Sequence, residues 1–556
     1  MPTIDISLDD LRKLVGDKFP KNIEELEPYV YNLKGEIEAV EGDAISIKLG
    51  DANRPDLWCA EGIARELKGL LGAAQGIPKY AAHPSNYRVI VNGKLEKVRG
   101  YIACAVITGL KLSDLIIKQI MQQQEKIDAS YGRNRKKTSI GLYNFDPLKW
   151  PLKYTMTKPH ENEFAPLGFS EKLSPHEILK QHPKGQEYGN LLKGLSEYPI
   201  FLDSENKVLS MPPVINSNDL GQVNEQTENV LVEVTGTDYE SANQVLRIIA
   251  MGLADRGGKI YEVKIDYPYR KIDTTPQFES KKISIGIPKA NELLGTKFDA
   301  ADITKLLRKM RYNLAPVSET ENIPHSLEIE IPCYRSDIMH PVDIYEDIAI
   351  AYGLNKFERE PLALPTSGKL SEQEKLSNKA RELCIGLGAQ EILNFTLTNK
   401  DNLFRLMTTK EENVIEIENP VSFTFSCLRN KLLPSLLEFL SKNTTKEFPQ
   451  KVFEVGDIVY PDAKADEKSV TERRLAFAVS HPEATFTEAR QALEAIFTNL
   501  GIKIAVKETE HESFIAGRCA AVWAGKERIG LVGEVHPQVL KNWGLEMPTV
   551  CFEIRL

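Results

Sequence analysis

The sequence contains few cysteines for its length, and their placement excludes two classes of structure. Seven cysteines are scattered singly along 556 residues, without a Cys-x-x-Cys pair. This odd, unpaired set indicates neither a disulfide framework nor a zinc site. The chain also lacks an apolar run of about 20 residues, the length that a membrane span needs. Residues 1–5 lack the basic and apolar character of a targeting signal. We therefore expect a reduced, cytoplasmic protein outside any membrane.

Positive charge is also scarce. The 70 Lys and Arg residues face 79 Asp and Glu residues, so the formal net charge is −9 at pH 7. This balance excludes nucleic-acid binding through bulk electrostatic attraction, and any RNA contact needs a local basic patch. The mixture of 42% apolar and 27% charged residues is typical of soluble globular domains. The chain is too long to fold around one hydrophobic core, and its length predicts roughly three to five domains.

A proline pair followed by a strand pattern predicts a small polar pocket in the middle of the chain. Pro212 and Pro213 fix φ and remove two hydrogen-bond donors, so this backbone must form a shaped loop. Residues 230–238 alternate like a half-buried strand and end in a Thr-Gly-Thr-Asp turn. Glu233 and Thr235 fall on one face of that strand, beside the loop. A plainer alternative is that these two side chains only form hydrogen bonds with the polar groups of the proline loop.

Two segments of the chain repeat the same order of patterns. Leu-Val-Gly-Asp-Lys-Phe at residues 14–19 is echoed by Leu-Leu-Gly-Thr-Lys-Phe at 293–298. A strand pattern before Arg-Pro-Asp at 54–56 is echoed by another before Arg-Ser-Asp at 335–337, and each copy continues into an amphipathic helix. Two copies indicate a duplicated domain rather than a solenoid. Chance similarity between short strand–helix units is the alternative.

The second copy carries a group of carboxylates, which are Asp337, Asp343, Glu346 and Asp347. A helix that begins near Pro341 places the last three on one face, because they are spaced i, i+3 and i+4. Carboxylate-only ligands suit a hard cation such as Mg²⁺. The alternative is that acidic residues in a first turn simply complement the helix dipole.

The densest basic run of the chain is Gly-Arg-Asn-Arg-Lys-Lys at residues 132–137. In an acidic chain this run is a candidate phosphate clamp for the end of an RNA. A solvated turn is the alternative. The cationic residues that would contact tRNA are Arg133, Arg135, Lys136 and Lys137.

The final region, residues 362–556, reads as mixed α/β. A helix is expected near residues 372–387, with strands at 451–456 and 474–479. Gly530 and Gly533 flank strand-type residues, which favours a hairpin or close packing over a phosphate loop.

Taken together, these motifs resemble the phenylalanyl-tRNA synthetase β subunit of the archaeal and eukaryotic type. The resemblance covers nearly the whole chain, and the order and spacing of the motifs carry it. The inserted oligonucleotide-binding barrel and the extra C-terminal RNA-binding domain of the bacterial type are missing from this sequence. The matching segments are residues 53–56, 132–137, 164–167, 211–217, 233–238, 335–347, 419–420, 428–429 and 533–537.

The resemblance implies a multidomain α+β fold with four domains. A small α/β domain at 1–83 and its second copy at 278–358, with the magnesium site, would flank an editing domain of mixed α/β type at 84–268. Residues 362–556 would form a class II synthetase-like antiparallel sheet domain. No Gly-x-Gly-x-Gly-x-x-Arg-like segment occurs near 525–537, so this last domain is expected to lack aminoacylation chemistry.

The resemblance also implies a function. The chain would be the β subunit of an (αβ)₂ ligase that joins phenylalanine to tRNA(Phe) with ATP and Mg²⁺. The α subunit would bind ATP and carry the aminoacylation site. The β subunit would bind tRNA and Mg²⁺, with Asp337, Asp343, Glu346 and Asp347 at the family's magnesium positions.

Editing of mischarged Tyr-tRNA(Phe) has a physical motive. A hydrophobic pocket rejects an analogue with one added hydroxyl by only about a hundredfold, so a second site that requires the hydroxyl is useful. Glu233 is our candidate for reading that hydroxyl. No Ser-His-Asp pattern is visible, so we expect attack by water on a positioned ester. The residues expected to hold the ester and the water are Thr235, Thr237, Asn216 and Ser217.

Two other functions stay open, and one segment departs from the family. One alternative is a purely structural and tRNA-binding subunit without editing activity. Another is a free-standing magnesium hydrolase with His340 as its acid–base group. Where the family often has Gly-x-His-Asp, this chain has Gly-Leu-Tyr-Asn at residues 141–144, so the polarity of the predicted pocket differs.

Overall fold

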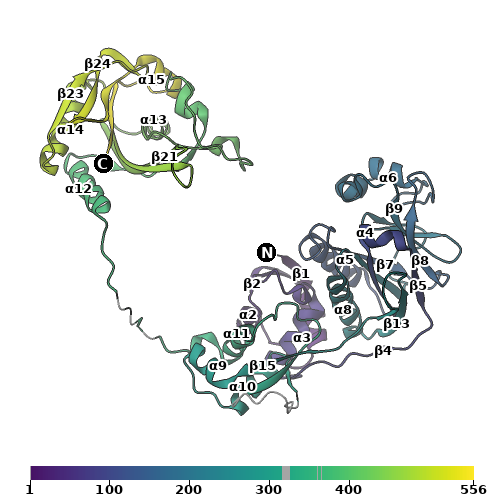
Figure 1. The fold of residues 1–556 in the computed structure, drawn as a ribbon. Helices are drawn as coiled ribbons and strands as arrows, with labels where there is room; N and C mark the ends of the chain where they lie inside the picture. The colour runs from purple at the N-terminus through teal and green to yellow at the C-terminus, as the bar shows by residue number, and fades with distance from the viewer. Residues whose placement is uncertain (1, 316–325, 360, 363, 365) are drawn as a thin grey trace. The chain divides into compact units, whose positions relative to one another are not determined.

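The computed structural model describes residues 2–315, 326–359, 361–362, 364 and 366–556. The chain forms two compact units, Met1–Glu360 and Pro361–Leu556, and each contains helices and β-sheets (Figure 1). The fold is therefore mixed α+β with several sheets, which confirms this part of the prediction. Within the described residues, no helix combines the length and the apolar composition that a membrane crossing requires.

Two small three-stranded sheets in the first unit share one topology. The first set of elements is β1 Thr3–Ser7, α1 Leu8–Val15, α2 Ile23–Asn32, β2 Gly35–Glu41, β3 Ala44–Leu49 and α3 Ala60–Leu70. The second set is β15 Lys281–Gly286, α9 Ile287–Leu294, α10 Ala300–Lys309, β16 Asn313–Leu314, β17 Ser326–Ile331 and α11 Pro341–Tyr352. The sheet orders are β1-β3-β2 and β15-β17-β16, and each central strand is antiparallel to both neighbours. The two repeated sequence segments thus have equivalent topology.

A large sheet lies between these two sets in the sequence. Its strands are β4 Ala82–His83, β5 Arg88–Val91, β6 Tyr101–Thr108, β7 Thr138–Asn144, β8 Leu152–Thr157, β9 Tyr198–Leu202, β10 Val208–Met211, β11 Ile215–Asn216, β12 Val230–Gly236, β13 Lys259–Asp266 and β14 Asp273–Thr275. The main path is β11-β10-β9-β8-β5-β13-β6-β12-β7. The accompanying helices are α4 Glu96–Arg99, α5 Asp114–Ala129, α6 Pro175–Gln181, α7 Pro183–Tyr188 and α8 Tyr239–Asp255.

Strand β12 lies inside this sheet, between β6 and β7, and is buried along its whole length. The prediction of a half-buried strand is therefore wrong at this point. Val232 and Val234 face the hydrophobic core beneath α8, whereas Glu233 and Thr235 face the opposite side and are also covered. The alternation marks two different buried environments, one apolar and one polar, rather than core and solvent.

One hydrophobic core joins the first small sheet to the large sheet. It contains Ile4 and Leu11 of the first set, Val232 of β12 and Ile249 of α8. The Arg256 guanidinium adds ion pairs to Asp10, at 2.8 Å, and to Glu61. The N-terminal set and the region of the large sheet therefore form one continuous packed body.

The second unit is built on a seven-stranded sheet with helices on both faces. Its strands are β18 Gln390–Glu391, β21 Gln450–Pro461, β22 Ser469–Ser480, β23 Ile504–Glu508, β24 Phe514–Ala524, β25 Glu527–Val535 and β26 Thr549–Arg555. The order is β18-β21-β22-β26-β25-β24-β23, and all pairs except β18–β21 are antiparallel. One face packs against α12 Glu372–Gly386 and α14 Phe486–Leu500, and the other against α13 Leu433–Ser441 and α15 Pro537–Trp543. The class II interpretation stays a prediction.

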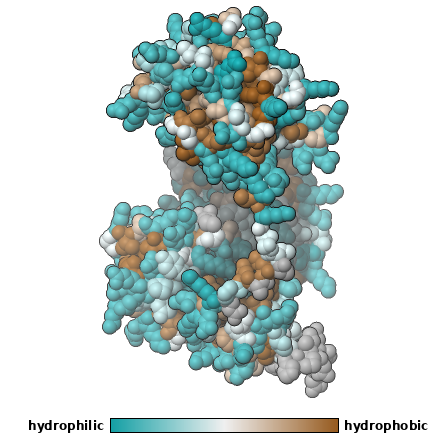
Figure 2. All heavy atoms as spheres, turned by 90° about the vertical axis from the view of Figure 1, so that its left-hand side faces the viewer, coloured by the Kyte–Doolittle hydropathy of each residue, from teal (hydrophilic) through white to brown (hydrophobic). Residues whose placement is uncertain are grey.

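Large apolar side chains are exposed around β19 Leu397–Thr398 and β20 Cys427–Leu428, which pair antiparallel. The rings of Phe395 and Phe425 lie 5.7 Å apart, so these residues gather locally. Figure 2 shows hydrophobic side chains in brown reaching the molecular surface among hydrophilic ones. The most exposed members of this apolar patch are Leu393, Phe395, Val421 and Phe423.

Candidate functional site

The proline loop and strand β12 enclose a cavity of about 200 Å³. The loop is the tight connection between β10 and β11, where Val214 N–H donates to Met211 O over 2.8 Å and the Pro212–Pro213 peptide is cis. Helix α5 and strand β7 supply the opposite wall, with Gln124, Ile140 and Leu142 among the lining residues. The predicted loop and strand therefore meet at one mixed polar and apolar pocket.

Glu233 lies at the wall of this cavity and forms part of a buried hydrogen-bonded chain. The Tyr143 hydroxyl donates to Glu233 Oε2 over 2.7 Å. It lies 2.8 Å from Ser210 Oγ, and because a phenol has one proton, the serine must donate to the phenol oxygen. Glu233 Oε1 is buried and forms no hydrogen bond of standard geometry with a described residue, although Thr235 lies close enough to lower the pKa of the carboxyl. This oxygen therefore has unused capacity as an acceptor.

Glycine at position 141 makes the contact between Tyr143 and Glu233 possible. Gly141 and Glu233 are direct partners in the β7–β12 ladder. A Cβ atom at Gly141 would collide with the Tyr143 hydroxyl and with Glu233 Oε2. The residue pair therefore occupies the space that a side chain at this position would take.

The Glu233 carboxyl has an unusual proton affinity. Burial raises its pKa to about 7, while the hydrogen bond from Tyr143 and the charge of Arg99 act in the opposite direction. Strong desolvation beside specific polar partners in a cavity is typical of functional carboxyls. Asp128, which lies on the same side of the sheet, has a pKa raised to about 7 by burial as well.

Thr235 belongs to the support of the pocket and does not line it. Arg99 Nε donates to Thr235 Oγ1 over 2.9 Å, and Arg99 Nη2 donates to Thr235 O over 2.8 Å. The same guanidinium donates to Ser139 Oγ over 3.0 Å. The side chain of Thr235 is therefore occupied by a buried arginine rather than presented to a ligand.

The other three predicted pocket residues occupy different positions. Asn216 lines the cavity, and its Nδ2 donates to Leu142 O over 3.2 Å. Ser217 is fully buried, and its Oγ accepts from Leu220 N over 3.2 Å. Thr237 is exposed beyond the end of β12. The structure thus brings Glu233 and Asn216 together at the cavity and leaves Ser217, Thr235 and Thr237 outside its lining.

The basic run splits into a structural part and an exposed part. Arg135 Nη1 donates to Pro213 O and Val214 O, over 3.2 and 2.9 Å, and Arg135 Nε lies 3.0 Å from Asp128 Oδ2. Arg135 therefore holds the proline loop and also lines the cavity. Lys137 pairs loosely with Asp238, at 3.8 Å. The exposed cations of the run are Arg133 and Lys136.

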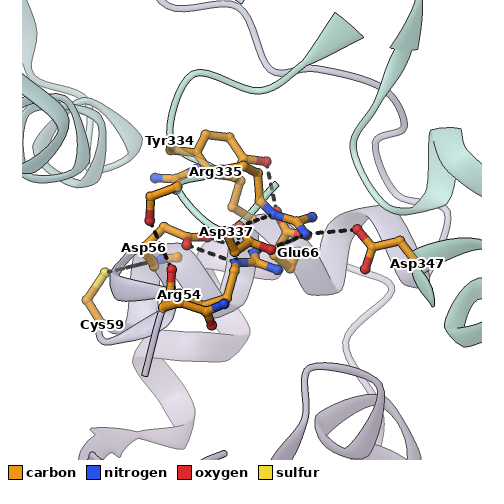
Figure 3. Close-up of polar contacts among 12 residues, drawn as sticks. Arg54, Asp56, Cys59, Glu66, Tyr334, Arg335, Asp337 and Asp347 are labelled. Carbon is orange, nitrogen blue, oxygen red and sulfur yellow. Dashed lines mark hydrogen bonds and ion pairs between the residues drawn. The ribbon is translucent and has the colours of Figure 1, made fainter. Parts of the chain in front are cut away.

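The repeated Arg-x-Asp motifs form a buried ion network where the two small domains meet (Figure 3). Arg54 binds Asp56 through two hydrogen bonds of 2.9 and 2.8 Å. Arg335 binds Asp337 in the same way, over 2.8 and 2.6 Å. Burial alone would raise the pKa of Asp337, but the charges of Arg335 and Arg54 lower it to about 2. Asp337 is therefore ionised, and both carboxylates are paired with an arginine.

The predicted magnesium ligands already have partners in this arrangement. Asp347 lies 2.9 Å from Arg335 Nη2, and Glu346 lies 2.9 Å from Lys34 Nζ. Asp343 Oδ2 accepts the backbone N–H groups at 339 and 340, both over 2.8 Å. Over the described part of the chain, His, Cys, Asp and Glu do not gather in a group of three or more that would hold a metal ion. As placed, these side chains do not fit a magnesium site, and Mg²⁺ binding stays a prediction that requires Glu346 to leave Lys34.

His340, the acid–base group of the hydrolase hypothesis, is the N-cap of α11. Its Nδ1 accepts from Val342 N over 3.3 Å. This position gives it a structural role at the start of the helix.

Comparisons with known proteins agree with this geometry. The family model described as the phenylalanyl tRNA synthetase beta chain CLM domain matches residues 358–556. The model described as the tRNA synthetase B5 domain matches residues 283–354, which contain the second small sheet. These matches define the chain as a component of an aminoacyl-tRNA synthetase.

Full-length relatives specify the family. The chain is 42% identical to the phenylalanine–tRNA ligase β subunit of Pyrococcus furiosus, over 100% of this chain and 99% of the relative. It is 40% identical to the β subunit of Thermococcus sibiricus, over 100% of this chain and 98% of the relative. The chain belongs to the family of phenylalanine–tRNA ligase β subunits.

A solved structure supports the fold of the first unit. A crystal structure of an N-terminal fragment of the Pyrococcus horikoshii phenylalanyl-tRNA synthetase β subunit matches with a TM-score of 0.60 and 40% identity. The match covers 63% of this chain and 100% of the fragment. The first unit of this ligase subunit accordingly has a fold known for this family.

Three residues around the cavity were not predicted as part of it, namely Arg99, Ser139 and Ser210. Arg99 and Ser139 precede β12 by about a hundred residues, and nothing in their local sequence marks them. The register of β6, β12 and β7 brings them together. Ser210 stands directly before the proline loop, but its contact with Tyr143 depends on the tertiary fold.

Proposed function

We propose that this β subunit hydrolyses mischarged Tyr-tRNA(Phe) in the cavity beside Glu233. The observation that carries the proposal is Glu233 itself, a buried carboxyl at the cavity wall whose Oε1 forms no hydrogen bond of standard geometry with a described residue. A tyrosyl side chain brings a hydroxyl donor to this atom. A phenylalanyl side chain leaves the acceptor unsatisfied, which costs about 1–3 kcal/mol.

The walls suit an aromatic residue. Ile140, Leu142 and Val214 provide apolar surface, while the carboxyl of Glu233 supplies the polar end. A site of this type accepts the larger amino acid and rejects the smaller one, which complements an aminoacylation pocket that excludes tyrosine only weakly.

Hydrolysis in this cavity proceeds by attack of water on the ester. The lining contains neither histidine nor cysteine, so a nucleophile–histidine pair is missing from the described cavity. Arg135 and Lys184 are the lining cations, and they favour the phosphates and the developing negative charge of the reacting carbonyl. Asn216 supplies an amide that can orient the ester or the water.

The proposal includes the partners of the subunit. It acts in the cytoplasm with an α subunit, in an (αβ)₂ heterotetramer, and the α subunit binds ATP and attaches phenylalanine to tRNA(Phe). The exposed apolar patch around β19 and β20 supports a protein partner, because apolar surfaces of this kind mark interaction sites. Arg133 and Lys136 support a contact with the tRNA backbone.

The test uses the chain co-expressed with its α partner. We expect Tyr-tRNA(Phe) to be deacylated faster than Phe-tRNA(Phe), and Glu233→Ala to remove most of this difference. Background decay of both esters in the wild-type complex would instead support the alternative, a structural and tRNA-binding subunit without editing activity.

A further inference from the structure

The second unit contains a cavity of about 240 Å³ on one face of its seven-stranded sheet. Strands β22, β25 and β26 form its floor, with Arg474, Leu531 and Glu553 among the lining residues. The start of α13 and the segments near residues 403–409 and 511–514 form its walls. This cavity lies in a different unit from the candidate editing site.

The carboxylates of the floor are already neutralised. Glu553 Oε2 accepts Leu432 N and Leu433 N, both over 2.9 Å, at the start of α13. Arg474 Nη1 donates to Glu553 Oε1 over 3.0 Å, and Arg474 Nε donates to Glu472 over 2.7 Å. These contacts fix the floor and leave little negative charge to act on a ligand.

The remaining polar groups of the cavity are donors. Arg528 is exposed, and its guanidinium forms no ion pair with a described residue. Thr409 Oγ1 is buried and has no hydrogen-bond partner in the described chain. His511 Nδ1 accepts from Ser513 N over 3.2 Å, so a neutral ring carries its proton on Nε2. Two other lining cations pair with acidic residues that lie outside the lining, Lys431 with Glu412 at 2.9 Å and Arg555 with Glu527 at 2.5 Å. Arg528 is therefore the lining cation without an ion pair among the described residues.

Apolar side chains complete the walls. Leu403, Met407, Leu433 and Phe514 all line the cavity. An apolar pocket with a few converging polar groups is the usual form of a small-molecule site. The donors require an acceptor, and the unpaired guanidinium of Arg528 favours an anionic one.

We infer that this cavity binds a small organic anion with an apolar body, such as an aryl or alkyl carboxylate. Arg528 pairs with the carboxylate, and Thr409 and His511 supply additional donors. The apolar body lies against Met407 and Phe514. The sheet face thus serves as a ligand site that is independent of the editing cavity.

The experiment follows the Met407 methyl group by NMR in the full-length chain, selectively ¹³C-methyl-methionine labelled and bound to its α partner. Loss of one resonance in Met407→Leu assigns the signal. The probe is 3-phenylpropionate, and the neutral control is 3-phenylpropionamide. We expect the carboxylate to shift the Met407 signal at lower concentration than the amide, by about tenfold, because a charged pair is lost in the amide.

Two variants and one matched control locate the site. Arg528→Glu weakens binding of 3-phenylpropionate by about tenfold or more, because it reverses a charge at the cavity. Thr409→Val, which replaces an unpaired hydroxyl, weakens it severalfold without loss of folding. Arg490→Glu makes the same charge change on exposed surface of α14 and leaves binding unchanged. Equal responses to acid and amide, an unchanged affinity in Arg528→Glu, or no shift at millimolar probe would overturn the inference.

Discussion

The hydroxyl oxygen of Tyr143 lies 2.7 Å from Oε2 of Glu233, and both side chains are buried. Tyr143 thus donates to one oxygen of the Glu233 carboxyl. We propose that the other oxygen accepts the hydroxyl of a substrate tyrosine. Tyr143 therefore acts as a positioning residue, because its hydrogen bond holds the Glu233 carboxyl in place at the cavity wall.

Replacement of Tyr143 by phenylalanine tests this relationship. The hydrogen bond from Tyr143 lowers the pKa of Glu233, so Tyr143→Phe raises that pKa further. The rise of tyrosyl-ester hydrolysis with pH should move to higher pH, by an amount that corresponds to roughly 1 kcal/mol. A pH–rate profile of the complex measures the shift. An unchanged profile, with hydrolysis intact, would contradict the positioning role.

The raised pKa of Glu233 also predicts a pH dependence of stability. The folded chain holds this proton up to about pH 7, whereas the ordinary carboxyl value is 4.5, so between these values the folded state binds more protons. The free energy of unfolding therefore falls as pH rises through this window. Glu233→Gln cannot ionise, so its thermal midpoint should exceed that of wild type at about pH 8 and approach it at about pH 5. A constant difference across pH would show that ionisation of Glu233 plays no part.

The network around Arg335 predicts a large loss on truncation. Arg335→Met leaves Asp337 and Asp347 buried without their main counter-charge, which should cost about 3–5 kcal/mol. Urea unfolding of the complex, followed by a probe in the first unit, measures this change. Arg490→Met is the control, because its exposed pair with Glu494 should contribute at most about 0.5 kcal/mol. Similar costs for both substitutions would refute the importance of the buried network.

The ion pairs of Lys34 with Asp51 and Glu346 lead to a prediction about the binding of divalent cations. Its ammonium lies 2.9 Å from both Asp51 and Glu346, so Lys34→Met frees two carboxylates. We expect Lys34→Met to bind Mn²⁺, used as a paramagnetic substitute for Mg²⁺, about tenfold more tightly than wild type. Water proton relaxation measures binding without recourse to activity. Equal, tight binding by wild type would instead show that Glu346 leaves Lys34 readily.

Substitutions in the basic run at residues 132–137 should affect either tRNA binding or the proline loop, depending on the residue replaced. Arg133→Ala with Lys136→Ala should weaken tRNA binding and reduce the slope of log affinity against log salt by roughly one to two units. The control, Arg490→Ala with Lys526→Ala, removes the same charge elsewhere on exposed surface. Arg135→Ala should instead disturb the proline loop that Arg135 holds. Filter binding at several salt concentrations separates these outcomes.

Much of the local structure follows from sequence pattern. The helix expected near residues 372–387 spans Glu372–Gly386, and the helix predicted to begin near Pro341 begins there. Glu233 could be found because alternation along β12 places it on the polar face beside a loop with fixed φ. In each case the determining forces act between residues close together in the chain.

The contacts that define the site were not predictable in the same way. Lys34 reaches Glu346 across more than three hundred residues, and Arg99 reaches Thr235 across 136. Such pairs depend on how separate sheets pack, which local periodicity does not report. The burial of both faces of β12 has the same origin, because the polar partners on its second face come from β7 and α4.

The core that the N-terminal set shares with the large sheet has a consequence for tRNA. Ile4 and Leu11 pack in the same cluster as Val232 and Val234 of the strand that carries Glu233, and Arg256 ties the two parts together. The cavity is therefore rigidly mounted on the first seventy residues and has no hinge of its own between them. For the editing that we propose, the misacylated tRNA end must therefore travel to a fixed site, and the reach of the single-stranded tRNA terminus, rather than a swing of the domain, would set which esters are hydrolysed.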